Sequence, residues 1–139
     1  MAKRHELTEH TADVGVLARA DSLGELYEAL AEGLADVIYD RSEVAGRVQR
    51  VVEVEAEDRE ALAVDFLSRL LTVVLADYFL YAAVRVEMDG ELRIRATLEG
   101  EAIDVARHEI RTEVKAITYH QLEVAPRDGR WVGRVILDL

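Results

Sequence analysis

Residues 84–98 carry the most constraining pattern in this sequence, because they read as a complete β-hairpin with its turn. Apolar and charged residues alternate through VRVEM and again through ELRIRATL, the two-residue period of strands with one buried face. Asp89 and Gly90 stand between the two runs, and Asp-Gly is a preferred pair for a tight hairpin turn. The pattern therefore predicts antiparallel strands at 84–88 and 92–98, with one apolar and one charged face.

Two amphipathic helices are predicted before this hairpin. The first spans 22–39 and begins with a capping box, in which Ser22 and Glu25 satisfy backbone amides of the first turn. The second begins at Asp58, a favourable N-cap residue, and continues to about Tyr78. Apolar residues recur at helical spacing in both: Leu23, Leu26, Tyr27, Leu30, Leu34, Val37 and Ile38 in the first, and Leu62, Phe66, Leu67, Leu70 and Val74 in the second.

Further strands are predicted in VGVLARA, near 48–56, and in a second hairpin where ITYHQLEV and WVGRVILDL flank PRDGR. The polar stretch 101–113 fits either a short helix or a loop. Two helices and about six alternating strands predict an α+β fold, a two-layer sandwich with both helices packed on one face of a largely antiparallel sheet. No linker divides the chain, so a single domain covering 1–139 is expected.

Charge and composition narrow the classes of function. The net charge of −11 argues against stable direct binding of nucleic acid, which needs clustered basic residues, and suits a cation or a basic protein partner instead. The absence of cysteine excludes disulfides, thiolate metal sites and a cysteine nucleophile. No apolar run reaches the roughly 20 residues that a membrane-spanning helix needs, and no signal-peptide core is present, so a cytoplasmic protein is expected.

Carboxylates at two strand ends are the first candidate site. Asp13 lies within HTADVG at the start of the first alternating strand, and Asp138 and the α-carboxylate of Leu139 end the last one. Oxygen ligands select hard cations such as Ca²⁺, Mg²⁺ or Mn²⁺, provided that several of them converge. On spacing alone, solvated or capping aspartates are the more common explanation of such residues.

Two histidines and a lysine are further candidates. His10, three residues before Asp13, could orient the aspartate or bind metal itself. His120 shares a strand face with Leu122 and Val124, which favours a partly buried structural histidine. Lys115 is one of only two lysines in an arginine-rich chain, and a compact ammonium can act beside carboxylates or phosphate where a guanidinium does not fit, although a surface lysine explains it as well.

Five segments in order resemble the archease family: HTADVG, SLGELYEALAEGLADVI, GEAIDVARH, EVKAITYH and WVGRVILDL. The similarity runs from about residue 10 to the last residue. It implies a small two-layer α+β domain of the strand-helix-strand-strand type. It also implies that the protein activates an RtcB-type RNA ligase, which joins tRNA halves, by promoting guanylylation and multiple turnover of that enzyme.

The same resemblance implies a site. The family's metal ligands correspond to Asp13, Asp138 and Leu139, with calcium the suggested ion and Mg²⁺ or Mn²⁺ as alternatives, while Lys115 is similar to the family's functional lysine. His10 and His120 are carried as candidates for metal or partner contact. The resemblance implies that such a protein is not an enzyme.

Two other classes of function stay open from the sequence. One is a free-standing metal-dependent phosphoesterase using Asp13, Asp138 and Lys115, which the lack of a basic face and of a catalytic base disfavours. The other is a chaperone-like modulator of a tRNA-modifying enzyme, such as a methyltransferase.

Overall fold

A computed structural model of the chain describes residues 3–9 and 13–139. The described elements run in the order β1 (Arg4–Glu9), β2 (Asp13–Ala20), α1 (Leu23–Ile38), the short 3₁₀ turn η1 (Arg41–Glu43), β3 (Val48–Glu55), α2 (Arg59–Leu75), β4 (Phe79–Met88), β5 (Arg93–Ala102), β6 (Ala116–Arg127) and β7 (Arg130–Asp138).

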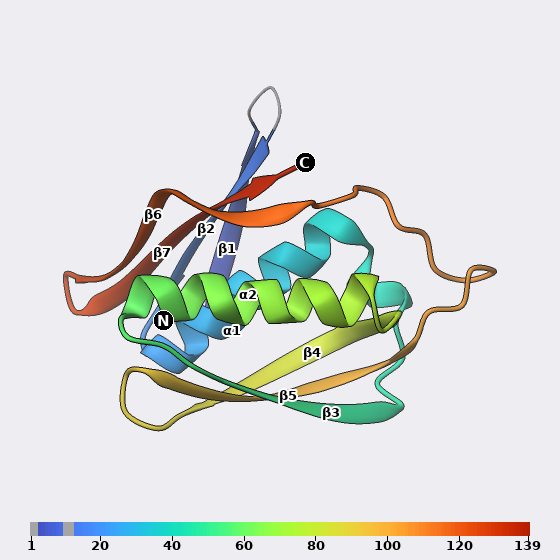
Figure 1. The fold of residues 1–139 in the computed structure, drawn as a ribbon, viewed down its shortest axis with the longest axis horizontal. Helices are drawn as coiled ribbons and strands as arrows, with labels where there is room; N and C mark the ends of the chain where they lie inside the picture. The colour runs from blue at the N-terminus through green and yellow to red at the C-terminus, as the bar shows by residue number, and fades with distance from the viewer. Residues whose placement is uncertain (1–2, 10–12) are drawn as a thin grey trace.

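The strands form two antiparallel sheets with the helices between them (Figure 1). One sheet has the order β1-β2-β7-β6 and the other the order β3-β5-β4. The predicted α+β class, with both helices packed on antiparallel strands, is confirmed. The sequence prediction placed all strands in one sheet, whereas the structure divides them, because α1 is buried on more than the one face that its large apolar residues mark.

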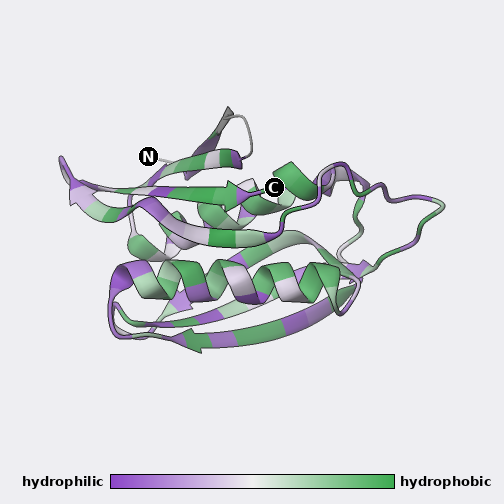
Figure 2. Ribbon diagram, turned by 45° about the horizontal axis from the view of Figure 1, so that its top comes forward, coloured by the Kyte–Doolittle hydropathy of each residue, from purple (hydrophilic) through white to green (hydrophobic). Residues whose placement is uncertain are grey.

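Small residues of α1 make this second contact. Ala31 lies against the β3-β5-β4 sheet, where its carbonyl oxygen accepts a hydrogen bond of 2.7 Å from the hydroxyl of Tyr81 in β4. Gly33 lies against the other sheet, because a Cβ there would come within 2.5 Å of Val16 in β2. Alternating apolar residues of the strands line the same interior (Figure 2). Alanine and glycine thus let both sheets approach one helix.

Both helix starts agree with the sequence prediction. The hydroxyl oxygen of Ser22 accepts from the backbone N–H of Glu25 at 3.2 Å, and the carboxylate of Asp58 accepts from the N–H of Ala61 at 2.7 Å. The end of α2 does not agree, because the helix stops at Leu75 and not near Tyr78. Tyr78 has a φ of 54°, a left-handed conformation that ends the helical path before β4 begins.

The β4–β5 pair begins earlier than predicted and contains a bulge. Its register shifts between Tyr81 and Ala83. Gly100 of β5 lies at this point, and a Cβ on it would come within 1.9 Å of the carbonyl oxygen of Leu80. Only glycine therefore permits this approach of the two backbones. The bulge also lets the buried Tyr39 hydroxyl donate to the Tyr81 carbonyl at 2.6 Å.

The hairpin β6–β7 closes through Asp128 and Gly129, whose φ angles of 53° and 77° suit a two-residue turn. Strand β6 is irregular between Thr118 and Glu123, and Gln121 has a φ of 52°. The predicted partial burial of His120 is wrong, because this irregularity breaks the alternation and leaves His120 exposed.

The polar stretch before β6 runs as a loop from residue 103 to 115, one of the two forms that the sequence allowed, and projects from the body of the molecule (Figure 1). No helix among the described residues is long and apolar enough to cross a membrane.

Candidate functional site at the β2–β7 strand end

Asp13 and Asp138 face each other across two neighbouring strands. Asp13 is the first residue of β2, Asp138 is the last residue of β7, and the antiparallel register pairs them directly. Residues opposite each other in such a pair project from the same face, with Cβ atoms typically about 4.5–5.5 Å apart. Two side chains that are 125 positions apart in the sequence (138 − 13) therefore meet at one end of the sheet.

Lys115 reaches the same end from the third strand. Its backbone N–H donates to the carbonyl oxygen of Asp138 at 2.7 Å, immediately before β6 begins. Ala116 pairs with Asp138 in the β6–β7 ladder. The side chain of Lys115 is exposed, and its ammonium forms no ion pair with any residue that the structure describes. Asp13 of β2, Asp138 of β7 and Lys115 next to β6 thus lie at the same end of the sheet.

The carboxyl terminus completes this end of the sheet (Figure 1). The side chain of Leu139 is partly buried and packs against the core, which fixes the last residue beside Asp138. Asp13 is partly buried, whereas Asp138 is exposed. Asp13, Asp138 and Leu139 therefore lie together at this end of the sheet.

This donor set fits a hard cation. Like charges directly opposite each other in a sheet destabilise it, and a divalent cation between them would remove that repulsion. The described residues contain no group of three or more His, Asp or Glu side chains able to hold a metal ion. Among the described side chains, Asp13 and Asp138 are the two carboxylates that this strand end offers to a cation.

The structure describes only one of the two candidate histidines. His10 lies outside the described residues. His120 is exposed on the irregular part of β6, where its backbone N–H donates to the hydroxyl of Thr118 at 3.3 Å. Among the contacts of the described residues, none joins the His120 side chain to Asp13 or Asp138.

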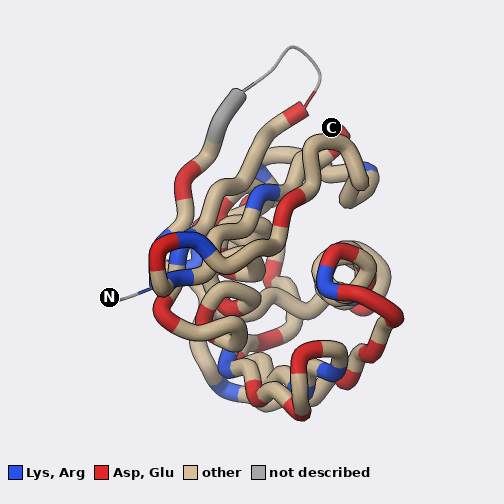
Figure 3. Tube along the Cα trace, turned by 90° about the vertical axis from the view of Figure 1, so that its left-hand side faces the viewer, with Lys and Arg blue, Asp and Glu red and all other residues tan. Residues whose placement is uncertain are grey.

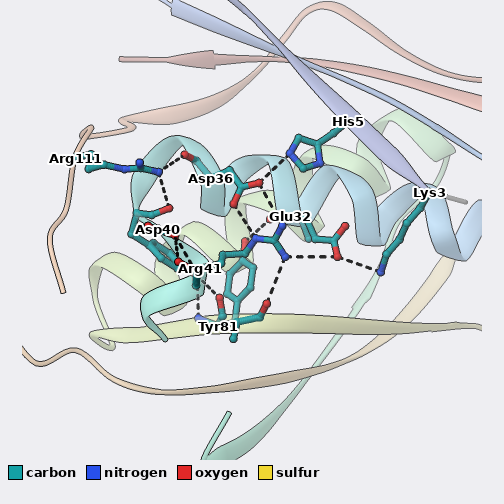
Figure 4. Close-up of polar contacts among 12 residues, drawn as sticks. Lys3, His5, Glu32, Asp36, Asp40, Arg41, Tyr81 and Arg111 are labelled. Carbon is teal, nitrogen blue, oxygen red and sulfur yellow. Dashed lines mark hydrogen bonds and ion pairs between the residues drawn. The ribbon is translucent and has the colours of Figure 1, made fainter. Parts of the chain in front are cut away.

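The structure also gives roles to two histidines for which the sequence offered no context. His5 of β1 lies 2.9 Å from a carboxylate oxygen of Asp36 in α1, and Arg41 donates to the same carboxylate at 2.8 Å (Figure 4). Burial raises the pKa of Asp36, but the hydrogen bonds from His5 and Arg41 outweigh it and hold that pKa below its usual value. Lys3 extends this network to Glu32 at 3.1 Å. These contacts fasten β1 to α1.

His108 is the second histidine to which the structure gives a role. Its Nδ1 accepts from the backbone N–H of Asp104 at 2.9 Å, which leaves the proton on Nε2, 3.1 Å from the carboxylate of Glu101. The backbone N–H of Ala45 and the guanidinium of Arg107 also bond Glu101, and they lower its pKa to about 2. This buried cluster holds the start of the 103–115 loop. Most of its members lie within GEAIDVARH, but the spacing there does not reveal the contacts with the distant Glu43 and Ala45.

The fold and the strand-end carboxylates define a class: small α+β proteins with two helices between antiparallel sheets and an acidic tip. The sequence profile of the Archease protein family matches residues 5–139. The chain belongs to the archease family. Curated relatives named protein archease include those of Thermococcus gammatolerans and Pyrococcus abyssi, 42% and 38% identical over 141 aligned residues, with 99% of each chain covered.

Solved structures agree with this assignment. The solution structure of Methanobacterium thermoautotrophicum protein 1598 has a TM-score of 0.80 at 35% identity and covers 97% of this chain and 98% of its own. The crystal structure of a Thermotoga maritima archease, described as a possible chaperone, has a TM-score of 0.67 at 20% identity and covers 96% of each chain. At that identity the second likeness concerns the fold alone.

Proposed function

We propose that this protein activates an RtcB-type RNA ligase in tRNA splicing, by promoting guanylylation and multiple turnover of the ligase, and that it has no ligase or phosphoesterase activity alone. The observation that carries the proposal is the meeting of Asp13, Asp138 and Lys115 at one strand end. Each belongs to a different segment of the archease resemblance.

The strand end would hold a divalent cation, with Ca²⁺ as the first candidate and Mg²⁺ or Mn²⁺ as alternatives. Asp13, Asp138 and the carboxylate of Leu139 would be its ligands from the protein, and the ion would supply a positive charge at an otherwise acidic tip. Lys115 would add a compact ammonium beside it. His10 and His120 remain candidates for contact with the partner.

Charge supports a basic protein partner. The chain carries 28 acidic and 17 basic residues, and the acidic ones are spread over the whole trace (Figure 3). A ligase that grips RNA is positively charged around its active site, so attraction between the two surfaces would speed and orient docking. We place this encounter in the cytoplasm.

The test is a ligation time course with tRNA halves in excess over the ligase of the same organism, in GTP and Mn²⁺. Adding the protein should turn a slow reaction into one with many turnovers, and the protein without ligase should show no ligation or phosphate release. Asp13→Ala and Asp138→Ala should abolish activation. Asp65→Ala, an exposed aspartate on α2, is the matched control and should activate normally.

Substitutions of Lys115 test in the same assay whether activation needs only a positive charge or also the compact shape of an ammonium group. Lys115→Ala should impair activation, and Lys115→Arg should restore only part of it, because a guanidinium is larger and planar. Turnover that is the same with and without added protein would overturn the proposal.

The sequence leaves a second function open, the modulation of a tRNA-modifying enzyme such as a methyltransferase. This alternative predicts that the protein binds the methyltransferase in a pull-down and leaves ligase turnover unchanged.

A further inference from the structure

Four arginines gather on the outer face of the β1-β2-β7-β6 sheet, at the end away from the paired aspartates. Arg127 of β6 lies directly opposite Arg130 of β7. Arg19 of β2 lies opposite Val132, so the register makes it the diagonal neighbour of both Arg130 and Arg134. The alternate residues of β2 and β7 are buried, which places all four arginines on the outer side.

These arginines line an open concave surface of about 750 Å³, together with Glu123, Asp128 and Val132. The surface lies at the β6–β7 hairpin, the left-hand end of the molecule in Figure 1 and the side that faces the viewer in Figure 3. Four arginines and two acidic residues give this lining a net charge of +2 (4 − 2), in a chain whose net charge is −11.

Three of the four arginines have a carboxylate of the chain within 4 Å, and two of these ion pairs are loose. Arg19 lies 3.7 Å from Glu6, and Arg130 lies 3.9 Å from Asp21, both longer than a hydrogen bond. Arg127 forms a close ion pair with Glu123, on the strand position opposite Arg134. Arg134 forms no ion pair within the part of the chain that the structure describes.

The arrangement also works against the stability of the sheet. Like charges directly opposite each other destabilise a strand pair, as Arg127 and Arg130 do here. Packing does not require them, because their side chains are 59% and 53% exposed. An anion between the guanidinium groups would remove the repulsion, and this is the state that the arrangement suits.

We propose that this surface, lined by Arg19, Arg127, Arg130 and Arg134, binds the phosphate groups of a small ligand, either a nucleotide polyphosphate or the phosphorylated end of an RNA. The planar fork of arginine matches phosphate oxygens in pairs, and two or more guanidinium groups match the multiple charge of a terminal phosphate or diphosphate. The concave surface has room for a compact ligand of this kind. The net charge of the whole protein repels a long polyanion, which favours a compact one.

This site is separate from the strand-end carboxylates. Arg134 and Asp138 are four residues apart in β7, about 13 Å at the rise of a β-strand. The proposal does not rest on ligase activation, since binding is measured on the isolated protein in a chelator. Its failure would leave the ligase proposal standing, and the reverse also holds.

The experiment is calorimetric titration of the full chain at low salt with EDTA present. The probes are inorganic pyrophosphate, GTP, a five-nucleotide RNA with a 3′-phosphate, the same RNA with a 3′-hydroxyl, and a hexaglutamate peptide. Pyrophosphate should bind, with an affinity that falls as salt rises. Binding of GTP alone would identify a nucleotide as the ligand, and binding of the 3′-phosphate RNA would identify an RNA end; each supports the proposal.

Variants assign the binding to this surface. Arg134→Gln and Arg130→Gln should each weaken pyrophosphate binding about tenfold, the loss of one charge-assisted contact. Arg134→Lys should fall between, because it keeps the charge and loses the fork. Arg95→Gln is the matched control: its side chain is 56% exposed on β5, in the other sheet, and its loss changes the net charge equally.

Three results would overturn the proposal. One is an equal loss of binding in Arg95→Gln and Arg134→Gln, and another is measurable binding of both RNAs with the same affinity, which would mean that the terminal phosphate is not recognised. The third is tighter binding of hexaglutamate than of pyrophosphate, which would identify a partner's acidic segment instead. Thermal unfolding of each variant confirms that the fold is kept, so a loss of binding reports on the site.

Discussion

Replacing Asp138 with asparagine should change stability in opposite directions with and without calcium. In a chelator, the substitution removes one of two carboxylates that the β2–β7 register places opposite each other, and it keeps the size of the side chain. In calcium, the same substitution removes a proposed ligand of the ion. The exposed position of Asp138 means that no packing is lost in either condition.

The magnitude follows from the separation of the pair. Two unit charges about 5 Å apart repel by about 0.8 kcal/mol in water and about 3 kcal/mol at an effective dielectric constant near 20. Because Asp138 is exposed, the lower part of this range applies, in agreement with the roughly 0.2–1 kcal/mol found for cross-strand pairs. Asp138→Asn should therefore stabilise the cation-free protein by about 0.5–1 kcal/mol.

In calcium, Asp138→Asn should instead be the less stable of the two proteins. At a concentration about 100 times its dissociation constant, an ion that binds only the folded state stabilises it by about 2.7 kcal/mol. The variant loses most of that gain and becomes less stable than the original protein by about 2 kcal/mol. For a chain of this length, 1 kcal/mol corresponds to about 3–5 °C in Tm.

The assay is thermal unfolding of both proteins in EDTA and in millimolar Ca²⁺, with Asp65→Asn on the exposed side of α2 as the control for charge. The control should respond to calcium as the unmodified protein does. If Asp138→Asn shifts Tm equally in the two solutions, the assignment of Asp138 as a ligand is refuted.

Three further outcomes test the fold. Gly100→Ala should lower the free energy of unfolding in urea by about 3 kcal/mol, because its Cβ would meet the Leu80 carbonyl oxygen at 1.9 Å. Gly46→Ala is the control: its nearest contact would be 3.6 Å, so it should change the free energy of unfolding by less than about 0.5 kcal/mol. Tyr81→Phe should cost about 1–2 kcal/mol in the same measurement, through the loss of a buried hydrogen bond to α1. The pKa of Glu101 is lowered from 4.5 to about 2 in the folded protein. Its contribution to stability is therefore present above pH 4.5 and disappears as the pH falls toward 2. Glu101→Gln should flatten the pH dependence of Tm within that range of pH.

Local signals in the sequence were enough to locate both helices and their first residues, although not the end of α2. The capping residues Ser22 and Asp58 fix where α1 and α2 begin, because a side chain that accepts from the first turn acts within three residues. The division into two sheets had no such signal. It depends on small residues of α1, such as Ala31 and Gly33, whose contacts with β4 and β2 become visible only in three dimensions.

The candidate site, like the fold, could be predicted from the sequence only in part. Asp13, Asp138 and Lys115 could be named from motifs, but their meeting depends on the strand order β2-β7-β6, which no spacing reveals. The role of His108 was missed because its ring joins Glu101 in β5 to the backbone of Glu43 in η1, which is 65 positions away in the sequence. The burial of His120 was mispredicted because the prediction extended the alternation of Leu122 and Val124 back to His120. The irregularity in β6 interrupts that alternation.

The aspartate pair therefore calls for a measurement of coupling and not only of single variants. In a double-mutant cycle, Asp13→Asn and Asp138→Asn should interact in the chelator by about 0.2–1 kcal/mol, because either substitution alone already relieves their repulsion. In calcium the interaction should change sign, because either substitution alone already removes the ion and the second then costs little. A structural role of Asp13 cancels in this cycle, since the same contacts of Asp13 are lost in both arms. A coupling energy that keeps its sign in calcium would mean that the two carboxylates do not share an ion.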